Sequence, residues 1–272
     1  MKRKRENQES SDNKSIKKVI LFCAIVVLLI IISLVIRFFI VFKNSKYDGN
    51  ARFTVAIVEK KSFRIFSFDP GSNQIAVLTV GGKVPAEPPQ RSVGAPIDGT
   101  VTVLDQLTIP SEPENALFTI ITHPTQTRND ITGVDLIRLY WFAKTVSAKN
   151  VQEERITLPG SENDIDKTVS RLLEDTHIID DNLSIEIVNG TDIPGMATRL
   201  ERIISNAGGN VVAVSSSHEI ERTSKIFYYQ KPSYTEAKLQ HMLGYPAFVT
   251  KTQGIADIKI IIGKDQAETK KF

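Results

Sequence analysis

The longest apolar stretch of the chain runs from Val19 to Phe42 and is interrupted by a single charge, Arg37. Val19 to Ile36 carries no charged residue, and as a helix it would span roughly 27 Å, close to the hydrocarbon thickness of a bilayer. The pattern therefore predicts one membrane-spanning helix at residues 19–42. A cleaved signal peptide is the alternative, but its apolar region is normally shorter, and the flank FKNSKYDGN has no small-x-small cleavage site.

Three short segments beyond this stretch alternate between polar and apolar side chains. Turn residues separate the second from the third, and together they predict a three-stranded meander over residues 52–58, 62–68 and 74–80. Two further segments, residues 99–104 and 117–122, are candidates for additional strands.

Apolar residues at helical spacing follow the predicted strands. They predict a helix over residues 131–148, capped by Asn129 or Asp130, and a weaker amphipathic helix over residues 161–175. The run Tyr140-Trp141-Phe142 lies in the first of these helices. It could form a stacking platform for a sugar or a base, or it could pack against the meander as part of the core, which we favour.

The last third of the chain has the most regular pattern. Strands and helices are expected in the order β-α-β-β-α-β, with a helix beginning after Thr191 or Asp192 as its cap, over residues 183–188, 194–206, 211–214, 225–229, 232–243 and 257–262. This order predicts a ferredoxin-like sandwich, in which two helices cover one face of a four-stranded sheet. The fold class expected for the whole chain is α+β, with a transmembrane helix, a mixed α/β middle part and the ferredoxin-like part.

The predicted organisation divides the chain into seven parts. They are a basic tail (1–18), the transmembrane helix (19–42), a linker (43–50), an α/β domain (51–175), a second linker (176–182), the C-terminal domain (183–265) and a tail (266–272).

Charge gives the predicted span a direction. Residues 1–18 hold seven Lys or Arg against three Asp or Glu, a net charge of +4, whereas the whole chain has a net charge of +3, so residues 19–272 sum to −1. Positive residues flanking a span stay in the cytoplasm, which predicts that residues 43–272 lie outside. The part outside has no basic excess, and nucleic acid is not an expected partner. The single cysteine, Cys23, lies within the apolar stretch, so the part outside has no disulfide.

One loop is a candidate binding site. Backbone N–H groups at the start of a helix can bind an anion or a sugar hydroxyl, and the alternative for such residues is turn formation and helix capping. The candidate ligand-binding residues are Asn189, Gly190, Thr191, Pro194 and Gly195. The four histidines, at positions 123, 177, 218 and 241, have no metal-ligand spacing, and neither a metal ion nor another cofactor is expected.

The same loop carries a family likeness. The run Ile185 to Ala197 (IEIVNGTDIPGMA) resembles the opening of the LytR C-terminal domain, and Ala256-Asp257, an apolar strand and Gly263-Lys264-Asp265 resemble its end. The resemblance covers residues 183–265. It implies an extracytoplasmic bacterial module that is often attached to LytR-CpsA-Psr proteins, which transfer glycopolymers from lipid carriers to peptidoglycan.

The middle part resembles a shortened, degenerate relative of the LytR-CpsA-Psr catalytic domain. The likeness rests on Phe66 to Pro70 followed by residues 74–80, on Gly94 to Gly99, and on the helix around residues 135–142. The active family places an Arg-Asp pair, which handles pyrophosphate and metal, where this chain has Thr79-Val80-Gly81-Gly82-Lys83. Phosphoryl transfer needs cations to neutralise developing charge, so no catalytic residue is expected.

The expected function is that of a membrane-anchored, extracytoplasmic, non-catalytic accessory or binding protein in cell-wall glycopolymer attachment or envelope maintenance. The alternatives are a divergent glycopolymer phosphotransferase and a scaffold for an active homologue. The expected partners are the lipid bilayer, through residues 19–42, peptidoglycan or wall glycopolymer, and other envelope proteins.

Overall fold

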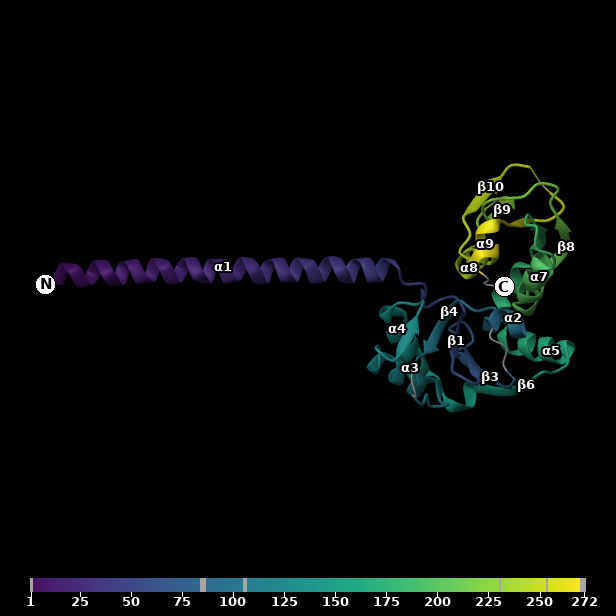
Figure 1. Ribbon diagram of the computed structural model, residues 1–272, viewed down its shortest axis with the longest axis horizontal. Coiled ribbons are helices and arrows are strands. Elements are labelled where there is room, and N and C mark those ends of the chain that lie inside the picture. The colour runs from purple at the N-terminus through teal and green to yellow at the C-terminus, as the bar shows by residue number, and fades with distance from the viewer. Residues whose placement is uncertain (1, 84–86, 105–106, 230, 253, 270–272) are drawn as a thin grey trace. The chain divides into compact units, whose positions relative to one another are not determined.

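The computed structural model describes residues 2–83, 87–104, 107–229, 231–252 and 254–269 (Figure 1). The chain separates into two compact units, residues 1–45 and residues 46–272. The first unit is one long helix, α1 (Lys2–Lys43). Its segment Ile20–Arg37 is long and apolar enough to cross a membrane, and none of that segment is buried inside the protein. This is consistent with the predicted membrane anchor.

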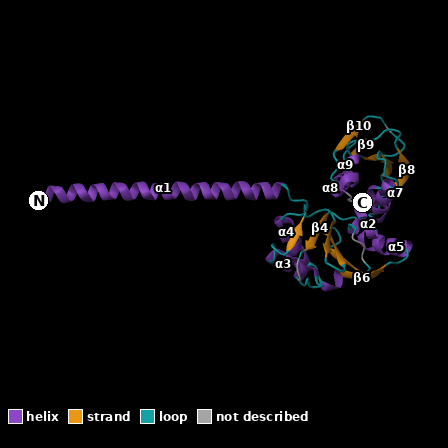
Figure 2. Ribbon diagram, in the orientation of Figure 1, coloured by secondary structure: helices purple, strands orange, loops and turns teal. Residues whose placement is uncertain are grey.

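The second unit contains two mixed sheets, drawn as orange arrows in Figure 2. The first has six strands in the order β5-β4-β1-β2-β3-β6. Strands β1, β2 and β3 form the predicted antiparallel meander, and β4 and β6 extend it by pairing in parallel with β1 and β3. The strands are β1 (Phe53–Val58), β2 (Phe63–Asp69), β3 (Gln74–Gly82), β4 (Gly99–Val103), β5 (Thr127–Asn129) and β6 (Val151–Leu158).

Both faces of the six-stranded sheet are covered. On β2, Phe66 and Phe68 belong to a core shared with α3 and α4, whereas Phe63 and Ile65 belong to a second core shared with α2 and α5. Because side chains alternate along a strand, these two pairs point to opposite faces. The helices are α2 (Pro89–Val93), α3 (Pro113–Thr122), α4 (Gly133–Thr145) and α5 (Glu162–Leu173).

Two local predictions for this part were wrong. Residues 117–122 lie in helix α3, because Pro113 occupies its first turn and Ala116, Leu117 and Ile120 form a buried stripe. Helix α4 is capped by Thr132, whose hydroxyl accepts a hydrogen bond from the Asp135 N–H, in a capping box.

The second sheet has five strands in the order β10-β9-β11-β7-β8. Strand β7 lies between β11 and β8 and pairs in parallel with both, while β9 pairs antiparallel to β11. The strands are β7 (Ser184–Asn189), β8 (Asn210–Ser216), β9 (Lys225–Tyr229), β10 (Ala247–Thr250) and β11 (Ile258–Ile262).

This topology corrects the ferredoxin-like prediction. A ferredoxin-like sheet is built from split β-α-β units, which require another strand between β7 and β8, but these two strands are direct neighbours. The sheet also gains β10, a strand that the sequence pattern did not indicate. The alternation of side chains identifies strands but does not determine which strands become neighbours. The β-α-β-β-α-β order of the remaining elements is as predicted.

Both helices of this part cover the same face of the sheet, as predicted. They are α7 (Met196–Asn206) and α8 (Tyr234–Leu243). One core joins Leu200 and Ile203 of α7, Leu239 of α8, and the strand residues Ile187 and Ile260. Helix α7 begins after Gly195, a left-handed residue with φ +79°, and not after the predicted cap at Thr191 or Asp192.

Three short elements complete the unit. Residues 176–182, predicted to be a linker, contain helix α6 (Thr176–Asp181), in which the Asp181 carboxylate accepts hydrogen bonds from the Thr235 backbone and hydroxyl. A 3₁₀ turn spans Ala148–Asn150. Helix α9 (Lys264–Thr269) lies partly in the predicted tail 266–272, of which residues 270–272 are outside the described residues.

Candidate functional site

The face of the five-stranded sheet opposite α7 and α8 carries aromatic side chains. Along β9, Ile226 and Tyr228 pack toward the helices, so Phe227 and Tyr229 point to the other face. Phe248 on β10 is opposite Phe227 in the register, and their ring centroids lie 5.9 Å apart. Phe248 is 47% exposed. This face therefore presents a pair of aromatic rings to solvent.

Phe227 and Tyr229 also line a cleft of about 330 Å³, beside which Phe248 lies. Its polar groups include an ion pair between Glu186 of β7 and Lys259 of β11, with Nζ–Oε2 at 3.4 Å. The carboxylate is mostly buried, and the ammonium is about half exposed. The cleft is lined by Glu186, Phe227, Tyr229, Thr250, Thr252, Gly254, Ile255, Ala256, Asp257 and Lys259. An aromatic surface beside hydrogen-bonding groups can bind a ligand that has both apolar faces and hydroxyls.

One end of the cleft is fixed by Asp257. Its carboxylate accepts hydrogen bonds from the Ser184 hydroxyl at 2.6 Å and the Ser184 N–H at 3.0 Å. These two hydrogen bonds, of which the one from the hydroxyl has the larger effect, hold the pKa of Asp257 below its usual value. Ser184 begins β7 and Asp257 precedes β11, so this contact sets the register of the two strands beneath the cleft.

The predicted binding loop follows the carboxyl end of β7, whereas the cleft lies toward the amino ends of β7 and β11. The structure therefore does not bring the loop and the cleft together. In the loop, the Asn189 amide donates to the Ile193 carbonyl at 2.9 Å, and its oxygen accepts from the Thr191 N–H and hydroxyl at 3.0 and 2.7 Å. The Gly190 N–H donates to the Ile262 carbonyl at 2.9 Å.

The other two candidate residues of the loop, Pro194 and Gly195, are exposed at the start of α7. The polar atoms of Asn189 form a turn, which is the capping alternative that the sequence left open. Ligand binding by these five residues stays a prediction.

The segment Thr79–Lys83, where the resemblance leads one to expect an Arg-Asp pair, lies at the end of β3. Gly82 pairs with Leu158 of β6, and the Lys83 N–H donates to the Leu158 carbonyl at 2.9 Å. Lys83 itself is exposed. Among the residues that the structure describes, no three His, Cys, Asp or Glu side chains are grouped so that they could hold a metal ion.

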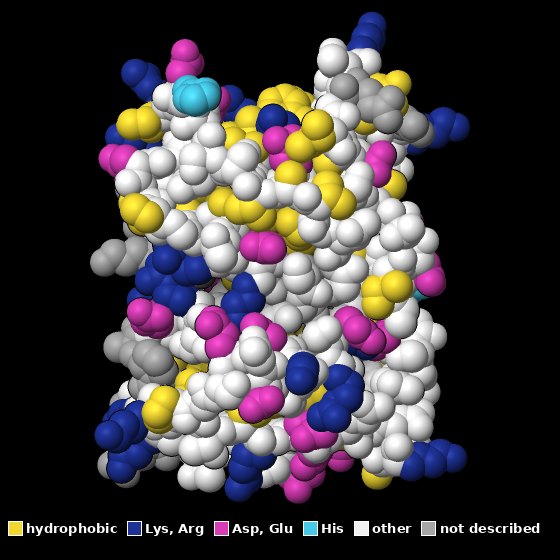
Figure 3. Space-filling view, turned by 90° about the vertical axis from the view of Figure 1, so that its right-hand side faces the viewer, with side chains coloured by type: hydrophobic (Ala, Val, Ile, Leu, Met, Phe, Trp, Pro, Cys, Tyr) yellow, Lys and Arg dark blue, Asp and Glu magenta, His cyan; other side chains and the backbone are white. Residues whose placement is uncertain are grey.

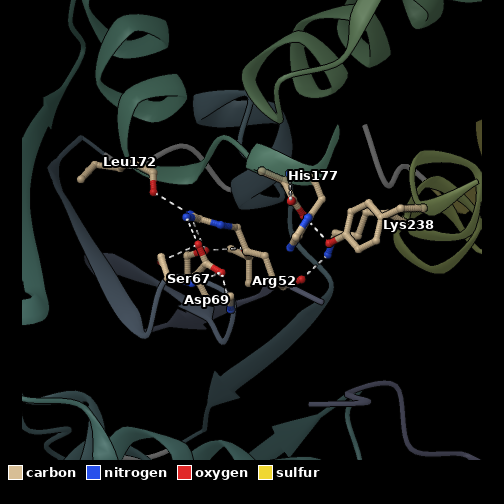
Figure 4. Close-up of polar contacts among 11 residues, drawn as sticks. Arg52, Ser67, Asp69, Leu172, His177 and Lys238 are labelled. Carbon is tan, nitrogen blue, oxygen red and sulfur yellow. Dashed lines mark hydrogen bonds and ion pairs between the residues drawn. The ribbon is translucent and has the colours of Figure 1, made fainter. Parts of the chain in front are cut away.

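A buried ion pair joins helix α8, which covers the second sheet, to the segment that leads into strand β4 of the first sheet. Lys238 of α8 contacts Asp98, which precedes β4, with Nζ–Oδ2 at 2.8 Å, and the two side chains are 8% and 5% exposed. The Asp98 carboxylate also accepts the Thr54 N–H at 2.8 Å, and Lys238 donates to the Arg52 carbonyl. Figure 4 shows Lys238 approaching Arg52.

Arg52 continues this network into the first sheet (Figure 4). Its guanidinium donates to the Asp69 carboxylate and to the Leu172 carbonyl, both at 2.9 Å. Burial acts to raise the pKa of Asp69, but the Ser72 hydroxyl and the Arg52 charge outweigh it and hold that pKa below its usual value. A small cavity of about 140 Å³ lies beside the network, and His241 is among its lining residues. The cations of Arg52 and Lys238 are already paired here, so the network is a structural joint.

Comparison with known families identifies the C-terminal part. A family model described as "LytR cell envelope-related transcriptional attenuator" matches residues 182–265. The chain carries a LytR C-terminal domain. The match includes all five strands of the second sheet, the aromatic cleft and the predicted binding loop.

Solved structures give distant matches to parts of this chain. Lin1025 of Listeria innocua is 9% identical, with a TM-score of 0.33, over 45% of this chain and 97% of that protein's chain. The transcriptional regulator yvhJ of Bacillus subtilis is 12% identical, with a TM-score of 0.27, over 40% of this chain and 83% of its own. Both scores are below 0.5, and neither match supports an assignment. A search of curated proteins finds no match.

Nothing in the sequence indicated Thr250 and Ile255 as cleft residues, or Phe248 as the partner of the Phe227 ring. Strand β10 has only four residues and directly follows the Gly244–Pro246 turn, so no alternation could be recognised there. A signal for the face was present in β9, where Phe227 and Tyr229 alternate with the core residues Ile226 and Tyr228.

Proposed function

We propose that this protein is anchored in the cytoplasmic membrane of a bacterium and binds wall glycopolymer or peptidoglycan through the aromatic cleft of its LytR C-terminal domain. The observation that carries the proposal is the pair formed by Phe227 and Phe248, with Tyr229 and the Glu186–Lys259 pair beside it. Sugar rings have apolar faces that pack on aromatic rings and hydroxyls that bond to charged side chains.

The proposed topology places residues 1–18 in the cytoplasm and residues 43–272 outside. The net charge of +4 before the apolar helix supports this orientation through the positive-inside rule. Charged groups of both signs are interspersed on the face in Figure 3, so that face presents no strong field to attract a polyanion.

Residues 51–175 serve in this proposal as a degenerate LytR-CpsA-Psr-like domain without phosphotransfer activity. The absence of the Arg-Asp pair from Thr79 to Lys83 supports this role. The domain boundary is proposed at residues 176–182, with a LytR C-terminal domain at residues 183–265. The protein would then assist glycopolymer attachment by holding the polymer close to the membrane.

Cosedimentation with purified sacculi tests the proposal. The full chain in detergent is mixed with sacculi that retain their covalently attached glycopolymers and with sacculi stripped of them. The F227A/F248A variant removes both rings and should weaken binding about tenfold, equivalent to ~1.4 kcal/mol. The control is F118A, which removes a phenyl ring of similar exposure, 52%, from α3.

Two results would overturn the proposal. One is sedimentation of the unmodified chain at the level of a protein without wall affinity. The other is equal binding by F227A/F248A and F118A, which would show that the cleft is not the binding surface. Binding only to sacculi with attached polymer identifies the glycopolymer as ligand, and equal binding to both identifies peptidoglycan.

A further inference from the structure

Helix α4 has apolar side chains on two sides. Leu136, Leu139 and Ala143 face the core of the six-stranded sheet. Ile137 and Trp141, one turn apart, are 47% and 63% exposed. A helix that only covers a sheet would carry polar residues on its outer side. The outer side of α4 is therefore free to contact a partner other than the sheet.

Neighbouring residues extend this apolar side into a continuous surface. The ring centroids of Phe118 and Tyr140 lie 5.9 Å apart, as do those of Tyr140 and Trp141. Lys144 places its ammonium 5.5 Å from the centre of the Tyr140 ring. We call this the α3–α4 aromatic surface, and it consists of Phe118, Ile137, Tyr140, Trp141 and Lys144. Rings with an apolar body and a polar edge, together with a basic side chain, are typical of protein segments at the membrane–water interface.

Helix α4 also forms hydrogen bonds to the segment that connects the folded part to α1. The Tyr47 N–H donates to the Asp135 carboxylate at 2.9 Å, and Arg138 donates to the Tyr47 carbonyl at 2.8 Å. The Tyr47 side chain is 3% exposed, so this attachment is part of the core. Tyr47 is four residues after Lys43, where α1 ends, and four extended residues span at most about 14 Å.

Trp141 lies a short distance along α4 from the point where Tyr47 is attached. Trp141 is six residues after Asp135 on α4, which corresponds to roughly 9 Å along the helix axis. The aromatic surface thus begins within a short chain length of the point where the anchor leaves the bilayer. The lipid surface is a partner that is always present near that point.

Resting on the proposed anchoring, we propose that the α3–α4 aromatic surface lies on the outer leaflet of the membrane that α1 crosses. The rings of Phe118 and Trp141 and the side chain of Ile137 enter the interfacial layer, and Lys144 meets the phosphate groups of anionic lipids. The span and this surface then fix the orientation of the folded part through two separate contacts.

Trp141 is the only tryptophan of the chain, so its fluorescence reports on this surface alone. The full chain is reconstituted in vesicles of phosphatidylcholine and phosphatidylglycerol, prepared with either ordinary or brominated acyl chains. Bromine quenches an indole that enters the lipid, and we expect emission to fall at least twofold in the brominated vesicles. The control carries W141F and F248W, which moves the only indole to β10, and its emission should be unchanged.

An alkaline carbonate wash separates this proposal from the proposed anchoring. Loss of the chain from the vesicles would refute the anchor. Retention of the chain with equal quenching of Trp141 and of the F248W control would overturn the lipid contact. A Trp141 emission shift that depends on the protein-to-lipid ratio would also overturn it and would indicate contact between two copies of the chain. A Trp141 emission shift caused by sacculi in the absence of lipid would overturn it as well and would indicate that this surface binds glycan. The I137S and K144E variants should each reduce the quenching while circular dichroism stays unchanged.

Discussion

Breaking the buried pair between Asp98 and Lys238 should destabilise the protein by about 3–5 kcal/mol. In D98N, the Lys238 ammonium, 8% exposed, keeps only uncharged acceptors, including the Arg52 carbonyl. In K238M, the Asp98 carboxylate keeps the Thr54 N–H but loses its ion pair, while the Lys46 ammonium donates to the Asp98 backbone carbonyl at 3.3 Å. Both side chains are at most 8% exposed, so each single variant should carry most of this penalty.

Urea unfolding of the full chain in detergent, followed by circular dichroism, measures the effect. The double variant D98N/K238M removes both charges, and it should be less destabilised than the sum of the two single changes by about 0.5–3 kcal/mol. The control is R171M, because the pair between Arg171 and Glu154 has a similar separation, 2.7 Å, but side chains that are 64% and 41% exposed. That change should cost at most about 1 kcal/mol.

A loss of unfolding free energy in D98N and K238M no larger than that in R171M would refute a buried, desolvated pair. Such a result would mean that water reaches the pair in solution. Additive single effects in the double variant would mean that the two charges do not interact, despite their 2.8 Å separation.

Two further predictions concern acid stability and a close backbone contact. The pKa of Asp69 in the folded state is below its unfolded value of about 3.9. Its contribution to stability is therefore complete above that pH and disappears as the pH falls through the folded pKa. D69N should flatten the acid side of the plot of unfolding free energy against pH, and a plot parallel to that of the unmodified chain would contradict this. In G190A the new Cβ would lie 2.8 Å from the Ile262 carbonyl oxygen, and urea titration should show a loss of about 1–3 kcal/mol. The control is G133A, whose new Cβ would have no atom within 4 Å apart from those of its chain neighbours and its own helix backbone, and it should change stability by less than about 0.5 kcal/mol. Similar losses in both variants would rule out the steric clash as the cause.

The sequence allowed the elements with strong periodicity to be predicted, but not their neighbours. Alternation in residues 52–80 identified the meander because consecutive short strands with tight turns pair with each other. Alternation in β11 identified a strand, yet its position between β9 and β7 depends on how all the helices pack. The same limit applies to α3, where the run from Leu117 to Thr122 fits either structure until Pro113 fixes the helix start.

The candidate cleft was harder to predict than the fold. Its residues come from β7, β9, β10, β11 and the segment after β10, so no local motif contains them. Asn189, Gly190 and Thr191 formed a recognisable motif because a single turn needs all three. The family likeness of residues 183–265 was recognised through this turn, although the turn lies at the other end of the strands from the cleft.

The pair between Asp98 and Lys238 also has a consequence for the order of folding during synthesis. The two residues are 140 positions apart, and the chain emerges from the ribosome with its amino end first. The Asp98 carboxylate therefore cannot form its ion pair with Lys238 until α8 has been synthesised. Contacts so distant in sequence form slowly, so this ion pair closes late in folding. A chain truncated before residue 238 lacks the pair, and its six-stranded sheet should unfold at a lower urea concentration than that of the full chain.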